Sequence, residues 1–292
     1  MTYARHPSYL AIDGGGTHCR FVVRHDGERF EVAGGSANVS TDFEAAQAVL
    51  RNGVTALANR AGIPVETLHA MPAFIGVAGV TGASMVKRLE AALPFKFAHY
   101  ADDRPAALCG ALGEASGFVA QCGTGSFFGA QIDGKLRLSG GWGSVLGDEA
   151  SAMWVGKRLL SYTLRCVDGL AEQSALSQSI LARFSDAPGI VQFAGRATPA
   201  ECGALAPLVT EAYAHGDRVA IRLMKDAASR VADELTALGW HPGLRICLTG
   251  GIGPHYADLL PDAMQADLSP PSADAIAGAE ALARKHALER VT

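Results

Sequence analysis

The 292-residue sequence predicts an α/β protein of two domains that share a duplicated core. Stretches with strand character alternate with amphipathic helical stretches along the chain, which is typical of α/β folds. The order strand, glycine turn, strand, Asp-Gly turn, strand occurs twice, at residues 9–32 and 117–138. A chain of this length also divides into roughly two domains. The alternative interpretation is that the two glycine-rich hairpins are unrelated.

The first copy begins with a three-stranded meander that contains the glycine turn 14–16. Its strands are predicted at residues 9–13, 17–24 and 29–32. Thr41 and Glu44 have the spacing of a capping box, and Gly62 is suited to end the helix that follows. Strand, helix, strand and helix then follow at residues 73–77, 84–93, 95–100 and 106–112.

The second copy repeats the meander and continues into a mainly helical region. Its strands are predicted at residues 117–121, 127–132, 135–138 and 245–249. Helices are predicted at residues 149–166, 174–184, 204–215, 217–238 and 273–285. We therefore expect a first domain at residues 1–114, completed by a C-terminal helix at 274–292, and a second domain at 115–273.

Composition and charge exclude several classes of protein. The net charge is −4 and no run of Lys or Arg occurs, so we expect no nucleic-acid partner. No apolar run approaches the roughly 18 residues that cross a bilayer, and the first residues lack the apolar core of a signal peptide. The six cysteines form no C-x-x-C pair, which favours free, buried thiols. Together these features predict a cytoplasmic protein without a membrane partner.

The two glycine turns are suited to hold phosphate groups. Glycine lets the backbone approach a ligand closely, and successive N–H groups in such a turn form an anion-binding nest. Thr17 and Thr124 would each add a hydroxyl donor. Neither turn contains the lysine of a Walker A loop, and the residues after Gly16 alternate like a strand rather than opening a helix. The turns therefore predict polyphosphate binding by another kind of site.

Asp13 ends the first strand beside the first glycine turn. A carboxylate next to a polyphosphate is repelled by it unless a cation lies between them. Mg²⁺ binds through one or two carboxylates together with substrate phosphates, so Asp13 is a candidate Mg²⁺ ligand, directly or through water. The alternative is an Asx-turn residue that serves the glycine turn.

Three motifs together resemble the sugar kinase and actin superfamily. Residues 10–17 (Leu-Ala-Ile-Asp-Gly-Gly-Gly-Thr) resemble its first phosphate motif, and residues 120–126 (Ala-Gln-Cys-Gly-Thr-Gly-Ser) resemble its second. Residues 247–252 (Cys-Leu-Thr-Gly-Gly-Ile) resemble the adenosine motif, and Ala227 falls where the family's long helix approaches the adenine. The ATP-binding residues that this implies are Gly14, Gly15, Gly16, Thr17, Gly123, Thr124, Gly125, Ser126, Ala227, Gly250 and Gly251.

The resemblance implies two actin-like, ribonuclease H-like domains with a duplicated βββαβαβα core and an active site in the cleft between them. Within the superfamily the chain is similar to the BadF/BadG/BcrA/BcrD ATPase group, and inside that group to N-acetylglucosamine and glucosamine kinases. Residues 35–38, 100–108 and 140–151 carry this likeness. The substrate-binding residues that it implies are Ser36, Asn38, Asp103, Gly141, Trp142, Gly143 and Asp148.

The resemblance places Asp103 on the catalytic aspartate, with Asp102 where the family usually has Asn. Asp102 is therefore the alternative choice, and Asp103 could instead cap the helix near Pro105. Trp142 could be a core aromatic or a flat face beside the sugar. Asp148 could serve the sugar or favour the dipole of a helix that begins there.

The expected function is transfer of the γ-phosphoryl group of MgATP to the 6-hydroxyl of an amino sugar, with Asp103 accepting its proton. The partners are the sugar and ATP; glucosamine and N-acetylglucosamine both stay open, as do a monomer and a homodimer. Other classes are an ATPase activator or regulatory member of the same family without kinase activity, a sugar-responsive transcriptional regulator, and a catalytically inactive sugar sensor. A regulator would need a DNA-binding segment, and only eight residues precede the first strand.

Overall fold

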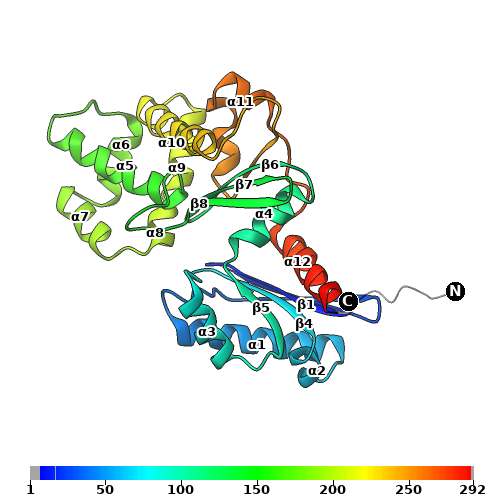
Figure 1. The fold of residues 1–292 in the computed structure, drawn as a ribbon. Coiled ribbons are helices and arrows are strands. Elements are labelled where there is room, and N and C mark those ends of the chain that lie inside the picture. Colours follow the sequence, from blue (N-terminus) through cyan, green and yellow to red (C-terminus); the bar gives the residue numbers. More distant parts are fainter. Residues whose placement is uncertain (1–6, 17, 291–292) are drawn as a thin grey trace. The chain divides into compact units, whose positions relative to one another are not determined.

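The computed structural model describes residues 7–16 and 18–290, so the predicted phosphate ligand Thr17 lies outside the described residues. The chain divides into two compact units (Figure 1). Unit 1 comprises Met1–Glu114 and Ser272–Thr292, and unit 2 comprises Ala115–Pro271. The last helix therefore packs with the first part of the chain.

Unit 1 is built on a five-stranded sheet in the order β3-β2-β1-β4-β5. The strands are β1 (Tyr9–Gly14), β2 (Cys19–His25), β3 (Glu28–Gly34), β4 (Pro72–Val77) and β5 (Phe97–Ala101). β1, β2 and β3 form an antiparallel meander, whereas β4 and β5 extend the sheet parallel to β1. The carboxyl ends of β1, β4 and β5 consequently meet at one edge, which we call the unit 1 edge.

Helices cover both faces of this sheet. They are α1 (Phe43–Ala61), α2 (Val65–His69), α3 (Ala83–Ala92), α4 (Arg104–Leu112) and α12 (Ala275–Glu289). Leu10 and Ile12 of β1 face the core beneath α1, whereas Tyr9 and Ala11 face α4 and α12, as the period of two in a strand requires. Asp13, the next residue of the second set, therefore points to the side of α4 and α12.

Unit 2 repeats this arrangement with a four-stranded sheet in the order β8-β7-β6-β9. The strands are β6 (Gly117–Cys122), β7 (Ser126–Ile132), β8 (Lys135–Gly140) and β9 (Ile246–Thr249). Again an antiparallel meander is extended by a strand parallel to its first member. A parallel bridge from Ile246 to Leu268 occupies the place of a fifth strand. This repetition confirms the predicted duplicated α/β core.

The helices of unit 2 pack mainly on one another and on one face of the sheet (Figure 1). They are α5 (Ala152–Val167), α6 (Ala175–Arg183), α7 (Ala187–Arg196), α8 (Pro199–Gly203), α9 (Ala206–Ala214), α10 (Arg218–Ala237), the 3₁₀ helix η1 (Gly253–Leu259) and α11 (Asp262–Ala266). The sequence did not predict the short elements α2, α7, α8, η1 and α11.

Two predicted helix starts are wrong. α1 is capped by Asp42, whose carboxylate accepts the Ala45 N–H, and not by a capping box of Thr41 and Glu44. α5 begins after Ser151, whose hydroxyl accepts the Trp154 N–H, so the predicted start at residue 149 is two residues too early for the cap and falls in a turn. In both cases a neighbouring side chain has the better geometry for accepting the free N–H groups of the first turn.

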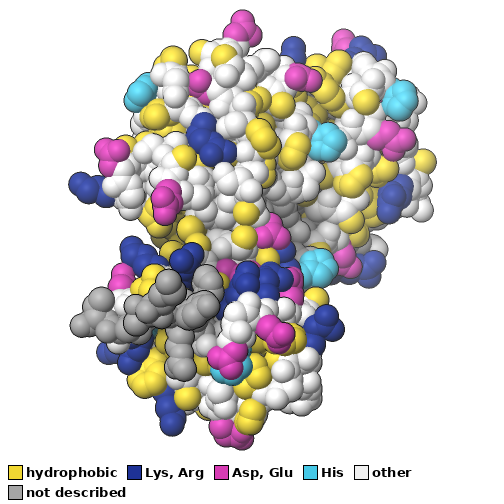
Figure 2. All heavy atoms as spheres, turned by 90° about the vertical axis from the view of Figure 1, so that its right-hand side faces the viewer, with side chains coloured by type: hydrophobic (Ala, Val, Ile, Leu, Met, Phe, Trp, Pro, Cys, Tyr) yellow, Lys and Arg dark blue, Asp and Glu magenta, His cyan; other side chains and the backbone are white. Residues whose placement is uncertain are grey.

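No helix in the described part of the chain is long and apolar enough to cross a membrane. Basic and acidic side chains are interspersed over the face of the molecule that Figure 2 displays.

Gly62 ends α1 in the left-handed conformation, as predicted.

Candidate active site

The unit 1 edge brings together two of the predicted site residues, Asp13 and Asp103. Asp13 pairs with Gly76 of β4, and Gly76 in turn pairs with Ala101 of β5. Asp102 and Asp103 follow directly, and a Cβ built on Gly76 would lie 3.5 Å from the Cα of Asp103. Because Gly76 of β4 has no side chain, the segment that carries Asp102 and Asp103 can pass close to the sheet.

The structure gives Asp102 and Asp103 different surroundings. The Asp102 carboxylate is paired with the Arg104 guanidinium. Asp103 has no ion pair among the described residues and, although it occupies the N-cap position of α4, its side chain makes no capping hydrogen bond. Burial, followed by the nearby carboxylates of Asp102 and Asp13, raises the pKa of Asp103 well above its usual value. The surroundings of Asp103 thus favour its protonated form more than those of an ordinary aspartate do.

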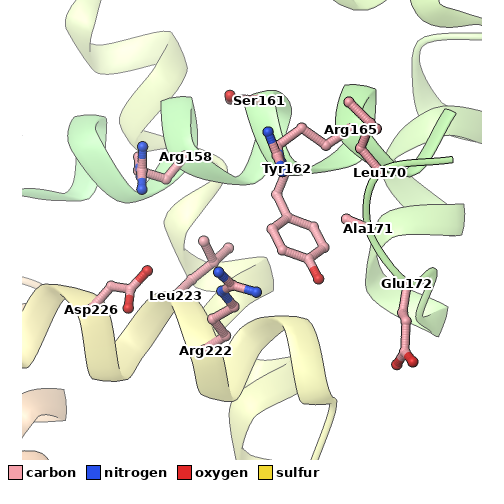
Figure 3. A pocket seen from close by; sticks show the side chains of 10 residues that line it. All are labelled: Arg158, Ser161, Tyr162, Arg165, Leu170, Ala171, Glu172, Arg222, Leu223 and Asp226. Carbon is pink, nitrogen blue, oxygen red and sulfur yellow. The ribbon is translucent and has the colours of Figure 1, made fainter. Parts of the chain in front are cut away.

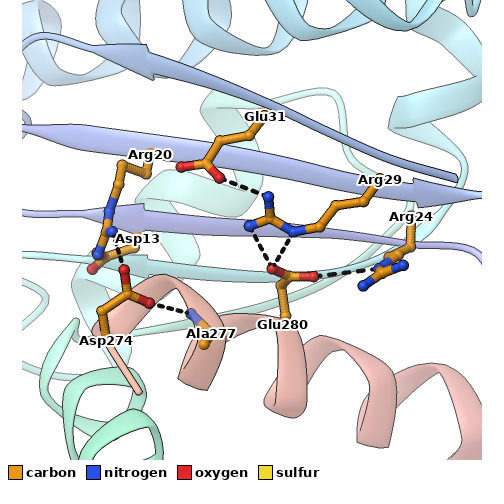
Figure 4. Close-up of polar contacts among 8 residues, drawn as sticks. All are labelled: Asp13, Arg20, Arg24, Arg29, Glu31, Asp274, Ala277 and Glu280. Atoms are coloured by element: carbon orange, nitrogen blue, oxygen red, sulfur yellow. Dashed lines mark hydrogen bonds and ion pairs between the residues drawn. The ribbon is translucent and has the colours of Figure 1, made fainter.

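Asp13 lies in a network that the sequence analysis missed (Figure 4). Arg20 donates through Nη2 to Oδ2 of Asp13 at 3.1 Å and through Nη1 to Oδ2 of Asp274 at 2.5 Å. Asp274 also caps α12 by accepting the Ala277 N–H at 3.2 Å. Burial raises the pKa of Asp13, and the hydrogen bond from Arg20 offsets only part of that effect. Arg20 therefore ties the candidate Mg²⁺ ligand to the N-terminus of the last helix.

The register of the first hairpin contains a signal for this contact. Asp13 and Arg20 are directly opposite one another across the antiparallel β1–β2 pair. Opposite charges in that position attract, so counting back from the glycine turn could have paired them. Asp274 could be recognised only as a helix cap, because its contact with Arg20 joins residues 254 positions apart.

The first glycine turn is held by the segment that follows β3. The Ala37 N–H donates to the Gly15 carbonyl at 3.1 Å, and the Ser36 hydroxyl donates to the Gly16 carbonyl at 2.7 Å. Gly16 itself is exposed. In this structure Ser36 thus supports the turn.

Asn38 organises the next turn through its side-chain oxygen. That oxygen accepts hydrogen bonds from the Ser40 N–H, the Ser40 hydroxyl and the Thr41 N–H. The amide nitrogen of Asn38 has no hydrogen-bond partner among the residues that the structure describes. The side chain is half-buried and has two N–H groups for an acceptor.

The second glycine turn in unit 2 is closed by short backbone contacts. The Gly123 N–H donates to the Gly125 carbonyl at 2.9 Å, and the first residue of α5 donates to the Gly123 carbonyl at 2.8 Å. Ser126 is buried and its hydroxyl donates to the Glu149 carbonyl at 2.6 Å. Thr124, at the tip, is half-buried. The Ser126 hydroxyl therefore holds the turn against the following loop.

Gly250 brings the predicted adenosine motif onto this second turn. Its φ of 79° is left-handed, and a Cβ there would lie 2.3 Å from the carbonyl oxygen of Cys122. The Ile252 N–H also donates to that oxygen, at 3.1 Å. Only glycine permits both the conformation and the approach. Gly251 is exposed beside it, so two separate motifs form one surface of unit 2.

Ala227 does not share that surface. Its side chain is 0% exposed and lies in the core of unit 2 against the sheet. Its neighbour Asp226 is exposed on α10. The structure thus places Ala227 in the packing of α10.

The segment between β8 and α5 has the most unusual backbone of unit 2. Gly141 and Gly143 are left-handed, and so are the non-glycine residues Asp148 (φ 62°) and Ala150 (φ 61°). Such conformations are costly for residues with a Cβ and are concentrated at functional sites. Asp148 does not begin a helix, which removes the helix-dipole interpretation.

Asp148 connects this segment to the second glycine turn. It is 8% exposed, and its carboxylate accepts the backbone N–H groups of Ser126 and Gly143. Burial raises the pKa of Asp148 despite these two hydrogen bonds. Trp142 is 69% exposed, so it is not a core aromatic. Its indole is open to solvent.

Comparison with known proteins places these motifs in context. The chain matches the BadF/BadG/BcrA/BcrD ATPase family over residues 10–267. It is 30% identical over 282 residues to the glucosamine kinase of Vibrio cholerae, covering 95% of this chain and 96% of that one. A solved structure from Chromobacterium violaceum, which was assigned provisionally as an N-acetylglucosamine kinase, is 32% identical to the chain with a TM-score of 0.83. The alignment covers 95% of this chain and 99% of that one.

A more distant neighbour shows the fold alone. A glucokinase of the ROK family from Streptomyces griseus, solved with glucose and AMPPNP, has a TM-score of 0.57 at 17% identity. The alignment covers 95% of this chain and 99% of that one. The two-sheet architecture is therefore that of the actin-like sugar kinases.

Proposed function

Because the chain belongs to the BadF/BadG/BcrA/BcrD ATPase family, we propose that it is an ATP-dependent amino-sugar kinase. It transfers the γ-phosphoryl group of ATP to the 6-hydroxyl of glucosamine or N-acetylglucosamine. The observation that carries this proposal is Asp103, a half-buried carboxyl group without an ion pair among the described residues and with a raised pKa, next to Asp13 at the unit 1 edge. The names of the V. cholerae and C. violaceum relatives support an amino sugar as the acceptor.

Asp103 has the properties of the base in this reaction. A base works best when its pKa lies near the operating pH, and burial beside two carboxylates moves the pKa of Asp103 in that direction. It would orient the sugar hydroxyl and accept its proton as the new O–P bond forms and the bond to the ADP oxygen breaks. Positioning and electrostatics provide most of the catalysis in phosphoryl transfer.

Asp13 fits a Mg²⁺ ligand. Mg²⁺ prefers oxygen ligands and is usually held by one or two carboxylates together with phosphates and water. Asp13 offers a carboxylate that is 14% exposed and engages Arg20 through Oδ2. Bound there with ATP, Mg²⁺ would neutralise phosphate charge. Arg20 would keep the Asp13 carboxylate in a fixed orientation for this role.

The glycine turns would hold the nucleotide through the backbone. In unit 2 the turn 123–126 and the segment 250–251 form one surface without large side chains. Their N–H groups can approach phosphate oxygens closely. Thr124 would add a hydroxyl, and Thr17 has the same expected role in the first turn.

Asp148, Trp142 and Asn38 are our proposed sugar contacts. Asp148 would accept hydrogen bonds from sugar hydroxyls, Asn38 would donate its amide N–H groups, and the exposed indole of Trp142 would cover an apolar ring face. Asp148 is held by two backbone N–H groups, so it is already oriented before the sugar arrives. Preorganised acceptors of this kind determine specificity.

A coupled ADP-release assay over a panel of sugars tests the proposal. We expect sugar-dependent ADP release with glucosamine or N-acetylglucosamine well above that with glucose or anhydro sugars. ADP release that is independent of every sugar would support instead an ATPase activator or regulatory member of the family. Sugar binding without ADP release would support an inactive sensor. Either result would refute the kinase.

A further inference from the structure

A groove in unit 2 lies outside all the residues discussed above. It runs between α5 and α10 and has a volume of about 550 Å³ (Figure 3). Arg158, Arg165 and Arg222 line it together with the polar side chains Ser161, Tyr162 and Asp226. In Figure 3 the side chains of Tyr162 on α5 and of Arg222 on α10 extend into the space between the helices, and Arg158 lies alongside α5.

The three arginines share the groove with the carboxylates of Asp226 and Glu172 but form no ion pair with either. None of them lies within 4.0 Å of a carboxylate in the described part of the chain. Glu172, at the rim, is paired with Arg218 instead, at 2.5 Å. Three like charges around one space repel one another, and a bound anion removes that repulsion.

Two of the guanidinium groups, both on exposed side chains, lie over aromatic rings. Arg158 lies 5.3 Å from the ring centroid of Trp154, and Arg222 lies 5.7 Å from that of Tyr162. A guanidinium over a ring is held by its face, so its N–H groups stay available in the plane. Arginine N–H groups fit phosphate oxygens in pairs, and such charge-assisted hydrogen bonds are the strong ones.

The remaining polar side chains of the groove are suited to bind hydroxyl groups of a ligand rather than a second anionic group. Asp226 is an acceptor and repels a purely anionic ligand, whereas the hydroxyls of Ser161 and Tyr162 both donate and accept. A volume of about 550 Å³ is in the range of small-molecule sites and exceeds the need of a bare phosphate ion. The lining therefore suits a phosphate group that is attached to a hydroxyl-bearing body.

We propose that this groove binds a sugar phosphate, with the phosphate on Arg158, Arg165 and Arg222 and the hydroxyls on Asp226 and Ser161. This is a second ligand site, distinct in its residues from the glycine turns. The first residue of α5 donates to the Gly123 carbonyl at 2.8 Å, so one helix joins the groove to the second glycine turn. The site is independent of the kinase proposal, because binding is measured without turnover.

Isothermal titration calorimetry of the whole protein tests the site. Glucosamine 6-phosphate is titrated in low-salt buffer after the protein has been saturated with glucosamine and MgADP. We expect residual binding at one site that weakens as salt is added. Inorganic phosphate and unphosphorylated glucosamine are the comparison ligands, and both should bind at least about tenfold more weakly, the effect of losing one or more charge-assisted hydrogen bonds.

Substitutions assign the binding to the groove. Arg165→Gln and Arg222→Gln should each weaken it about tenfold or more, since each removes a charged donor. Arg183→Gln, on the exposed side of α6, is the matched control and should leave it unchanged. Unfolding midpoints should be the same for all three variants. No residual binding by the saturated protein, equal binding of inorganic phosphate, or equal loss in the Arg183 variant would each overturn the proposal.

Discussion

Replacing Asp103 by Asn separates the catalytic and the structural consequences of its charge. The Asp and Asn side chains have nearly the same size. The Asn amide can donate a hydrogen bond to the Asp102 carboxylate, whereas Asp103 can do so only when one of the two aspartates carries a proton. The substitution also removes the repulsion that Asp102 and Asp13 exert on Asp103. We therefore expect a protein that is more stable at neutral pH and almost inactive.

The sign of the stability change follows from the raised pKa of Asp103. A carboxyl group whose pKa is higher in the folded than in the unfolded state binds its proton more tightly when folded. Wild-type stability therefore falls relative to the variant as the pH rises from about 3.9, the usual Asp value, through the folded-state pKa. At pH 8 we expect the Asn variant to be more stable on the order of 1 kcal/mol, the scale of one charge-assisted hydrogen bond.

The catalytic loss is larger. A general base typically contributes about 10²–10⁴-fold, so kcat should fall by at least about 10²-fold while ATP binding persists. Urea unfolding at pH 4 and pH 8 measures the stability difference, and the coupled ADP assay measures kcat. Asp233→Asn, an exposed position on α10, is the control for a neutralised carboxylate. Full turnover in the Asp103 variant, or lower stability at pH 8, would refute the reasoning.

Three further changes probe the surrounding structure. Arg20→Gln removes the cation beside Asp13, so we expect the pKa of Asp13 to rise. The acid limb of the pH profile of kcat/KM for MgATP should then move to higher pH, and an unmoved limb would contradict this. Gly278→Ala places a Cβ 1.9 Å from a backbone oxygen of α4 and should lower the free energy of unfolding by at least about 1–3 kcal/mol in urea, whereas Gly195→Ala meets no atom within 4 Å and should not destabilise. Asp148→Ala should raise KM for the sugar about tenfold or more, and an unchanged sugar KM would exclude its ligand role.

Much of the fold could be predicted because its signals are local. Each sheet begins with a hairpin whose glycine turn and Asp-Gly turn are visible in the sequence, and every strand of the two sheets was expected near its observed place. The short helices α2, α8 and α11 span five residues each, which is too few for a helical period to appear. The sequence predicts the cap of α1 at Thr41, whereas the structure has it at Asp42, one position later. Thr and Asp are both good capping residues, so residue type alone does not decide between them.

The candidate site was less accessible, because adjacent residues of the same type differ only in their tertiary surroundings. Asp102 and Asp103 are identical in chemistry, and no periodicity distinguishes them. What separates them is that Arg104 holds Asp102, whereas Asp103 is half-buried near Asp13 and has no ion pair among the described residues.

The charges at the unit 1 edge explain how four carboxylates are held there. Arg20 engages Asp13 and Asp274, and Arg104 engages Asp102. Each of these three carboxylates is thereby held by an arginine, whereas Asp103 has no ion pair among the described residues and has a raised pKa. A carboxylate held in an ion pair is a poor proton acceptor, because the cation stabilises its charged form. We therefore expect Asp103, rather than the three carboxylates that the two arginines hold, to take the proton from a bound hydroxyl.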